Sequence, residues 1–239
     1  MTSIPAATPI RGVVVDFHHT LVHAGDAARW VRDSWRDLGR DGDPRTVFGP
    51  ETFDAAVSFL DRIWEHARDV DPDSDRDLDA RRHRDVYDRT VVGAPGVDKE
   101  LADAMYALTH LQWDTYTDTL PVLQALRDNG TRIVVLSNVG YDLRPVLRRT
   151  GIDGLVDGLV MSYEVGVVKP DRGIFQRALD LLGLPAAEVL MVGDAWSDDA
   201  AAAALGVRTL ILPRTDTDSH GLELVLRLVV VSTPGRPSG

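Results

Sequence analysis

Hydrophobic positions follow different spacings in different parts of the chain. An apolar run, Val13 to Val15, lies within residues 10–21, which we expect to form a strand and its exit. Between residues 22 and 115 the apolar side chains recur at the intervals of amphipathic helices, and no stretch there has the alternation of a strand. This segment therefore predicts a small helical bundle. Its helices are expected around Trp30 to Leu38 and Phe53 to Trp64, and from Asp77 to Val91 and Val97 to Leu111.

From Leu120 onward, short apolar runs alternate with helical patterns of similar length. This alternation favours a parallel sheet that is covered by helices on both faces. The expected strands are Arg132 to Leu136, Gly154 to Tyr163, Val189 to Val192 and Arg208 to Leu212, and the expected helices are Pro121 to Asp128, Asp142 to Arg149, Gly173 to Leu182 and Asp198 to Leu205. The sequence thus predicts an α/β protein, with a doubly wound core domain of residues 1–21 and 116–239 and a helical insert of residues 22–115.

Candidate catalytic side chains lie where the expected strands end. Asp16 follows the first apolar run, Ser137 the second, and Asp194 a later one. Lys169 lies in a loop and is one of only two lysines in the chain. The carboxyl ends of parallel strands meet at one edge of a sheet, so these groups can converge. They are the components of metal-assisted phosphoryl transfer, although taken singly Asp16 and Asp194 also suit helix N-caps.

Four stretches, in this order along the chain, resemble the motifs of the haloacid dehalogenase (HAD) superfamily. They are Asp16 to Thr20, Ser137-Asn138, Lys169-Pro170-Asp171, and Gly193-Asp194 to Asp199. The helical insert resembles the cap that this superfamily carries at its first cap site. The resemblance implies a Rossmann-like core and a metal-dependent hydrolase of a small phosphorylated metabolite, most simply a phosphomonoester phosphatase.

The resemblance also implies roles in the reaction. Asp16 attacks phosphorus and forms an aspartyl-phosphate. Lys169 neutralises charge on the nucleophile and on the phosphoryl group. Thr20, Ser137 and the backbone amide of Asn138 hold phosphate oxygens or orient the nucleophile.

A magnesium ion is implied as well. Its ligands are expected to be Asp16, the backbone carbonyl of His18, and Asp194, with support from Asp199 or Asp198. The metal makes physical sense, because a dianionic phosphate cannot approach several carboxylates without a cation between them.

The first motif departs from the superfamily pattern at His18, where phosphatases of this kind have a second Asp that acts as general acid and base. Three interpretations are open. An imidazole, with an ordinary pKa of about 6.5, can perform the same proton transfers. Alternatively the role is lost, and the chain is an impaired member that binds a phosphorylated ligand or a protein partner. The third interpretation is a metal-independent 2-haloacid dehalogenase, against which the intact motif from Asp194 to Asp199 argues.

Two neighbouring features bear on the same region. His19 replaces a usual glycine, which costs on the order of 1 kcal/mol if the backbone has positive φ there. His18, His19 and His23 together would suit a softer metal such as Zn²⁺.

In the insert, the basic stretch Arg81 to Arg84 with Tyr87 would either contact an anionic substrate or form a solvated helix face, and the second interpretation is favoured.

Composition narrows the classes of function. The net charge of −11 argues against a nucleic-acid-binding protein. The absence of cysteine excludes disulfides and thiolate metal sites. No apolar run is long enough to span a membrane, and Met1 to Pro9 does not have the pattern of a signal peptide. We therefore expect a cytoplasmic enzyme, either a monomer or a homodimer, with no membrane or nucleic-acid partner.

Overall fold

The computed structural model describes residues 8–215 and 217–230, so most of the stretch Met1 to Pro9 lies outside the described residues. The chain divides into two compact units. The first, here called the sheet unit, comprises the described residues up to His23, Thr115–Asn138, and the described residues from Leu147 onward. The second, the helical unit, comprises Ala24–Asp114 and Val139–Val146.

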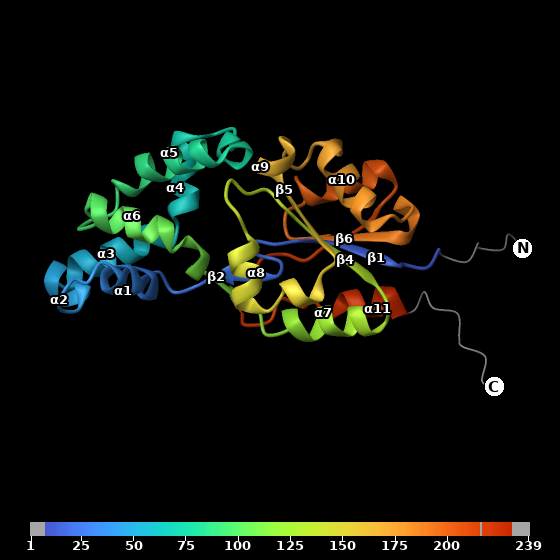
Figure 1. Cartoon of the computed structure of the whole chain (residues 1–239), viewed down its shortest axis with the longest axis horizontal. Helices are drawn as coiled ribbons and strands as arrows, with labels where there is room; N and C mark the ends of the chain where they lie inside the picture. Colours follow the sequence, from blue (N-terminus) through green and yellow to red (C-terminus); the bar gives the residue numbers. More distant parts are fainter. Residues whose placement is uncertain (1–7, 216, 231–239) are drawn as a thin grey trace, which may run out of the picture. The chain divides into compact units, whose positions relative to one another are not determined.

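The sheet unit is built on a parallel sheet of five strands in the order β5-β4-β1-β6-β7 (Figure 1). The strands are β1 (Gly12–Asp16), β4 (Arg132–Ser137), β5 (Gly158–Met161), β6 (Val189–Gly193) and β7 (Arg208–Ile211). β1 lies at the centre, where Gly12 is in register with Arg132 of β4 and with Val189 of β6. The prediction of a doubly wound α/β sheet is confirmed.

Helices cover both faces of this sheet. α10 packs on one face, and α7 and α11 contact each other on the opposite face (Figure 1). The helical elements of this part of the chain are α7 (Thr119–Asp128), α8 (Arg144–Thr150), η3 (Asp153–Leu155), α9 (Ser162–Val165), α10 (Arg172–Leu182), η4 (Ala186–Glu188), η5 (Asp199–Leu205) and α11 (Leu224–Val230).

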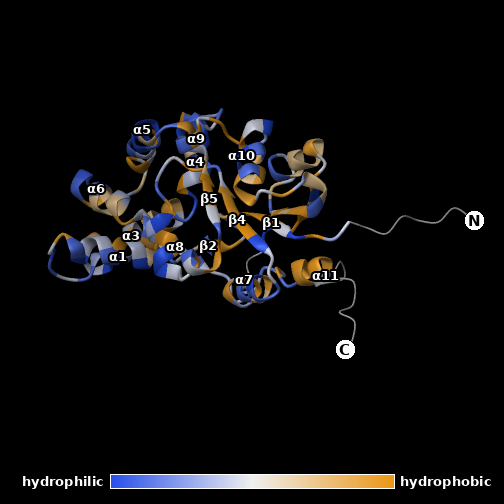
Figure 2. Ribbon diagram, turned by 45° about the vertical axis from the view of Figure 1, so that its right-hand side comes forward, coloured by the Kyte–Doolittle hydropathy of each residue, from blue (hydrophilic) through white to orange (hydrophobic). Residues whose placement is uncertain are grey.

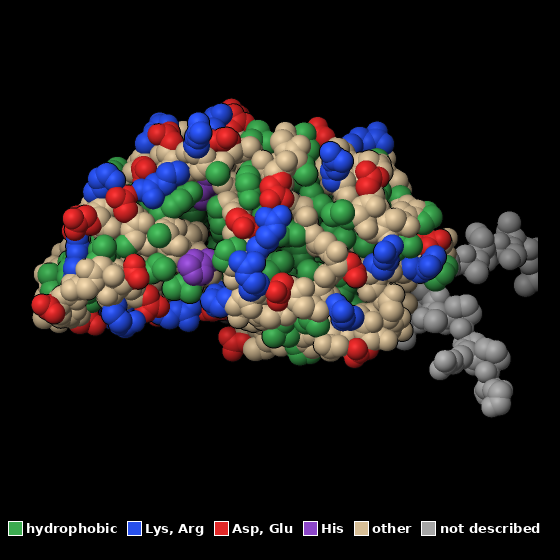
Figure 3. Space-filling model, in the orientation of Figure 1, with side chains coloured by type: hydrophobic (Ala, Val, Ile, Leu, Met, Phe, Trp, Pro, Cys, Tyr) green, Lys and Arg blue, Asp and Glu red, His purple; other side chains and the backbone are tan. Residues whose placement is uncertain are grey.

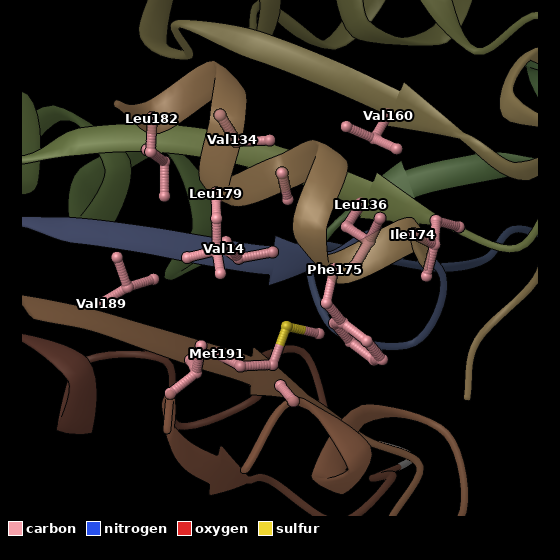
Figure 4. Close-up of a cluster of buried hydrophobic side chains, with 13 residues drawn as sticks. Val14, Val134, Leu136, Val160, Ile174, Phe175, Leu179, Leu182, Val189 and Met191 are labelled. Carbon is pink, nitrogen blue, oxygen red and sulfur yellow. The ribbon is translucent and has the colours of Figure 1, made fainter. Parts of the chain in front are cut away.

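The core of the sheet unit explains why its strands are rich in β-branched and aliphatic residues. Val14, Leu136 and Met191 come from three strands and pack against Ile174 and Phe175 of α10 (Figure 4). Figure 2 shows the hydrophobic colouring of β4 between the helices of this unit. Because both faces of the strands are buried, their sequences are continuous apolar runs, and each strand carries its first polar groups where it leaves the core.

Two elements of the sheet unit differ from the sequence-based expectation. The strand expected at Gly154 to Tyr163 pairs only over Gly158–Met161, because β5 is an edge strand that reaches only the last four residues of β4. The alanine-rich segment at Asp199–Leu205 forms a 3₁₀ run rather than an α-helix.

The helical unit contains α1 (Ala27–Asp37), α2 (Pro44–Phe48), α3 (Pro50–Leu60), α4 (Ile63–Val70), η1 (Asp75–Leu78), α5 (Ala80–Val91), α6 (Lys99–Ala107) and η2 (Thr109–Leu111). Its core includes Trp30, Phe53 and Tyr87. The helix expected through Phe53 to Trp64 is split in two, because Arg62 has φ −118° and ψ 19°, outside the helical region.

The prediction of no strand between residues 22 and 115 is wrong. β2 (Val22–Ala24) and β3 (Trp113–Thr115) pair as a two-stranded sheet where the chain leaves and re-enters the sheet unit. Each strand has only three residues, which is too short for an alternating pattern to appear.

The segment Val139–Val146 was expected in the core domain, but it belongs to the helical unit. Tyr141 accepts a hydrogen bond from Trp113 Nε1 at 2.8 Å, and its ring packs on His83 at a centroid distance of 5.2 Å. A Cβ on Gly140 would lie 2.3 Å from the carbonyl oxygen of Arg76, so only glycine allows this approach. These contacts join residues far apart in the sequence, and local patterns do not reveal them.

Acidic side chains balance the arginines of the helical unit. Arg40 forms ion pairs with Asp98 and Glu100, and Arg84 with Asp88. Figure 3 shows acidic and basic side chains interspersed over the face that it draws. Within the stretch Arg81 to Tyr87, His83 and Tyr87 are buried in the unit itself. Among the described residues, no helix combines the length and the apolar character that a bilayer span requires.

Candidate active site

Asp16 is the last residue of β1, and its side chain is buried at the carboxyl edge of the sheet. Both carboxylate oxygens accept hydrogen bonds. Lys169 Nζ donates to Oδ1 at 2.6 Å, and Thr20 Oγ1 donates to Oδ2 at 3.2 Å. The turn after β1 thus places the Thr20 hydroxyl beside the carboxylate of Asp16. The contacts with Thr20 and Lys169 together set the orientation of this carboxylate.

Lys169 lies in the loop between α9 and α10, yet its side chain is only 4% exposed. Nζ also donates to Asp199 Oδ1 at 2.7 Å. The side chain of Asn138 holds the backbone of Lys169 from both sides: Lys169 N donates to Asn138 Oδ1 at 2.7 Å, and Asn138 Nδ2 donates to the carbonyl of Lys169 at 3.1 Å. The amide side chain of Asn138 therefore positions the lysine, a contact that sequence reasoning missed.

Asp199 is fully buried, and its Oδ2 accepts a hydrogen bond from Ala195 N at 3.0 Å. A Cβ on Gly193 would lie 2.0 Å from this same oxygen, so glycine is needed where β6 ends. Asp198, by contrast, accepts from its neighbour Ser197 at 3.1 Å in an exposed setting. The structure therefore brings Asp199, rather than Asp198, to the site.

Asp16, Asp194 and Asp199 form a cluster in which one oxygen of each carboxylate lies within 4.8 Å of the others. Burial raises the pKa of Asp16 to about 7; Lys169 opposes this shift, while Asp199 and Asp194 add to it. Burial acts to lower the pKa of Lys169, but the two adjacent carboxylates outweigh it and raise the pKa above its usual value. Three carboxylates, contacted by two cationic side chains, Lys169 and Arg214, offer oxygen ligands that suit a hard cation.

Within residues 8–215 and 217–230, no other three His, Cys, Asp or Glu side chains bring ligand atoms this close together. The alternative of a zinc site at His18, His19 and His23 is therefore wrong, because the ring nitrogens of these three histidines do not form such a cluster. His19 has φ 60°, so the strain expected for a non-glycine residue applies. Burial, with a contribution from Arg214, lowers the pKa of His19 to about 4.

His18 leans towards the end of the neighbouring strand. Its Nδ1 lies 3.3 Å from Oγ of Ser137, the last residue of β4, whose side chain is fully buried. The ring also packs edge-on against Phe17 at a centroid distance of 5.0 Å. The imidazole and the Ser137 hydroxyl thus share the edge of the sheet at which Asp16 lies.

Arg214 is a further residue that sequence reasoning missed. Its Nε donates to Asp194 Oδ2 at 2.5 Å, and the carboxylate that it contacts is only 4% exposed. Arg214 follows β7, the edge strand next to β6. Polar groups that follow the strands of a parallel sheet meet at one edge. Applying this rule to the last strand as well would have identified Arg214.

Comparison with known proteins agrees with the fold and with the resemblance to the HAD superfamily. A model of haloacid dehalogenase-like hydrolases matches residues 10–206. Haloacid dehalogenase-like hydrolase domain-containing protein 3 of Danio rerio is 30% identical over 144 residues, which are 59% of this chain and 60% of that protein. Enolase-phosphatase E1 of Sorangium cellulosum (strain So ce56) is 29% identical over 219 residues, 89% of this chain and 91% of that protein.

The fold is also that of solved structures. A 2-haloacid dehalogenase from Pseudomonas syringae pv. Tomato DC3000 superimposes with a TM-score of 0.61 at 22% identity, over 94% of this chain and 100% of that one. Residues 10–206, which the family model matches, contain Asp16, Ser137, Lys169, Asp194 and Asp199. The protein is therefore a member of the haloacid dehalogenase-like hydrolase family.

Proposed function

We propose that this hydrolase is a metal-dependent phosphatase of a small phosphorylated metabolite and acts through an aspartyl-phosphate on Asp16. The observation that carries the proposal is the buried contact of Lys169 with both Asp16 and Asp199. It supports an oriented carboxylate nucleophile whose charge is balanced at the place where an anionic group must approach. The relative from Sorangium cellulosum is named as a phosphatase.

In the first step, a carboxylate oxygen of Asp16 bonds to phosphorus while the bond from phosphorus to the leaving oxygen breaks. His18 gives the leaving oxygen its proton. In the second step, water attacks the phosphorus, His18 takes up a proton, and Asp16 is released with inorganic phosphate. Thr20, Ser137 and the amide of Asn138 hold the phosphate or the nucleophile, and Lys169 neutralises charge in both steps.

The donor set fits Mg²⁺. Asp16, Asp194 and Asp199, whose carboxylate oxygens already cluster, would hold the ion together with the backbone carbonyl of His18. When bound, the ion would supply positive charge between the carboxylates and the phosphate oxygens. Burial is the main cause of the raised pKa of Asp16, and the nearby carboxylates of Asp199 and Asp194 add to it, so a cation placed beside these groups would be stabilised.

A panel of phosphomonoesters tests the proposal. With Mg²⁺ we expect the purified protein to release inorganic phosphate from p-nitrophenyl phosphate and from small alkyl phosphates. EDTA should lower the rate by about 10²-fold or more, because a bound metal supplies several kcal/mol of charge stabilisation. If no phosphomonoester of the panel is hydrolysed but phosphonates bind tightly, the result would instead support an impaired protein that binds a phosphorylated ligand. Metal-independent halide release from 2-haloacids would indicate a dehalogenase.

Replacing His18 separates a working imidazole from a degraded site. We expect His18→Gln to lower kcat for alkyl phosphates by about 10²- to 10⁴-fold, the usual contribution of a general acid or base. The loss should be smaller for p-nitrophenyl phosphate, whose leaving group needs little protonation. His66→Gln in the helical unit is the matched control. Higher activity in His18→Asp than in the wild type would contradict the acid/base role.

A further inference from the structure

We propose that Arg214 binds a second anionic group of the substrate, a carboxylate or a phosphate, on the part of the molecule that leaves. The substrate would then be a phosphomonoester that also carries a carboxylate or another phosphate. The inference deepens the proposed phosphatase function and rests on it only for the identity of the transferred group. It starts from the contrast between the two cationic side chains that contact the carboxylate cluster, Lys169 and Arg214.

Lys169 is buried and is held by two protein carboxylates. Its ammonium is buried and donates to Asp16 and Asp199 at 2.6 and 2.7 Å. Arg214 is engaged at one atom only. Its Nε donates to Asp194, its side chain is 57% exposed, and Nη1 and Nη2 have no protein acceptor within the part of the chain that the structure describes.

The geometry of the guanidinium makes this contrast meaningful. Arginine presents its N–H donors in a planar fork, and the edge formed by Nη1 and Nη2 matches the two oxygens of a carboxylate or phosphate. The charge-assisted bond from Nε to Asp194 holds the group in place before a ligand arrives, so less side-chain freedom is lost on binding.

Distance places this edge within reach of a small substrate. Asp194 holds Arg214 and also has an oxygen within 4.8 Å of an oxygen of Asp16. We expect one small substrate to span an oxyanion on Nη1 and Nη2 and the nucleophile, because a single carboxylate, Asp194, lies beside both Arg214 and Asp16. The transferred phosphoryl group, in contrast, is expected beside Lys169, Thr20 and Ser137, so Arg214 remains for a different group of the same molecule.

Calorimetric binding of three phosphonates in Mg²⁺ tests the inference without requiring turnover. Propylphosphonate has no second anion, 3-phosphonopropionate adds a carboxylate, and ethylene-1,2-bisphosphonate adds a second phosphonate. We expect the wild type to bind at least one of the two ligands that carry a second anionic group about 10- to 100-fold more tightly than propylphosphonate. This is the scale of a charge-assisted bidentate contact. The ligand that gains more identifies the carboxylate or the phosphate as the natural group.

Arg214→Gln should bring these affinity ratios close to one, whereas Arg177→Gln, which removes the same charge from an exposed site on α10, should keep them. If Arg214 only neutralises Asp194, its loss would weaken all three ligands alike and leave the ratios intact, which overturns the inference. A wild type without preference, or without binding to any of the ligands, overturns it too. A phosphatase that turns over simple esters but shows no such preference would retain the proposed function and lose this inference alone.

Discussion

Replacing Asp16 with asparagine should abolish phosphomonoester turnover. We expect kcat to fall by at least about 10³-fold on every substrate that the wild type hydrolyses, the scale of losing a covalent nucleophile. Asparagine keeps the size of the side chain, and its amide oxygen can still accept from Lys169 or Thr20, but it cannot form an aspartyl-phosphate. Steady-state phosphate release measures the loss, and mass spectrometry of acid-quenched protein should detect the phosphorylated intermediate in the wild type only.

A matched control makes this result specific. Asp180→Asn changes an exposed carboxylate on α10 that accepts a hydrogen bond from Gln176, and it should leave turnover within a few-fold of the wild type. The covalent mechanism would be ruled out if Asp16→Asn, in protein free of deamidated material, kept more than about a tenth of the kcat of the wild type.

Comparison with the same variant should also reveal how Asp16 makes the unfolding free energy depend on pH. In the metal-free protein the pKa of Asp16 is raised from 3.8 to about 7, chiefly by burial. The folded protein therefore keeps a proton on Asp16 that the unfolded chain releases near pH 4. Stability from this group is present below that pH and is lost as pH rises towards 7. In EDTA, we expect the unfolding free energy of the wild type, relative to Asp16→Asn, to fall over this interval, as urea denaturation would measure.

Replacing Lys169 with methionine should strongly destabilise the fold as well as stop catalysis. The change leaves Asp16 and Asp199 buried without their shared cation, and breaking one side of a buried ion pair costs about 3–5 kcal/mol. The loss of unfolding free energy should be larger at pH 8 than at pH 5, because Asp16 can take up a proton at the lower pH. Urea denaturation at the two pH values measures both effects.

The other lysine of the chain is the natural control. Lys99 lies on the surface of α6, where its side chain is 84% exposed and pairs with Asp103 one helical turn away. Lys99→Met should change the unfolding free energy by about 0.5 kcal/mol or less. An equal, small effect of both substitutions would mean that Lys169 does not compensate the buried carboxylates.

Local patterns were sufficient for the fold class and for most of the candidate site. The apolar runs that end at Asp16, Ser137 and Gly193 identify strands buried on both faces, and their alternation with helices implies a parallel sheet. In such a sheet the residues after each strand meet at one edge, whatever the details of packing. For that reason the sequence could place Asp16, Ser137 and Asp194 together without any knowledge of side-chain positions.

The sequence alone thus determined the sheet, the inserted helices and the set of polar residues at the sheet edge, because each depends on spacing along a single segment. Only the tertiary structure decided that Asp199 rather than Asp198 lies beside Lys169, that Asn138 holds the backbone of Lys169, and that Val139–Val146 belongs with the helices. It also brought Arg214 to Asp194. These features depend on the direction of individual side chains and on contacts between distant segments, which a one-dimensional pattern does not record.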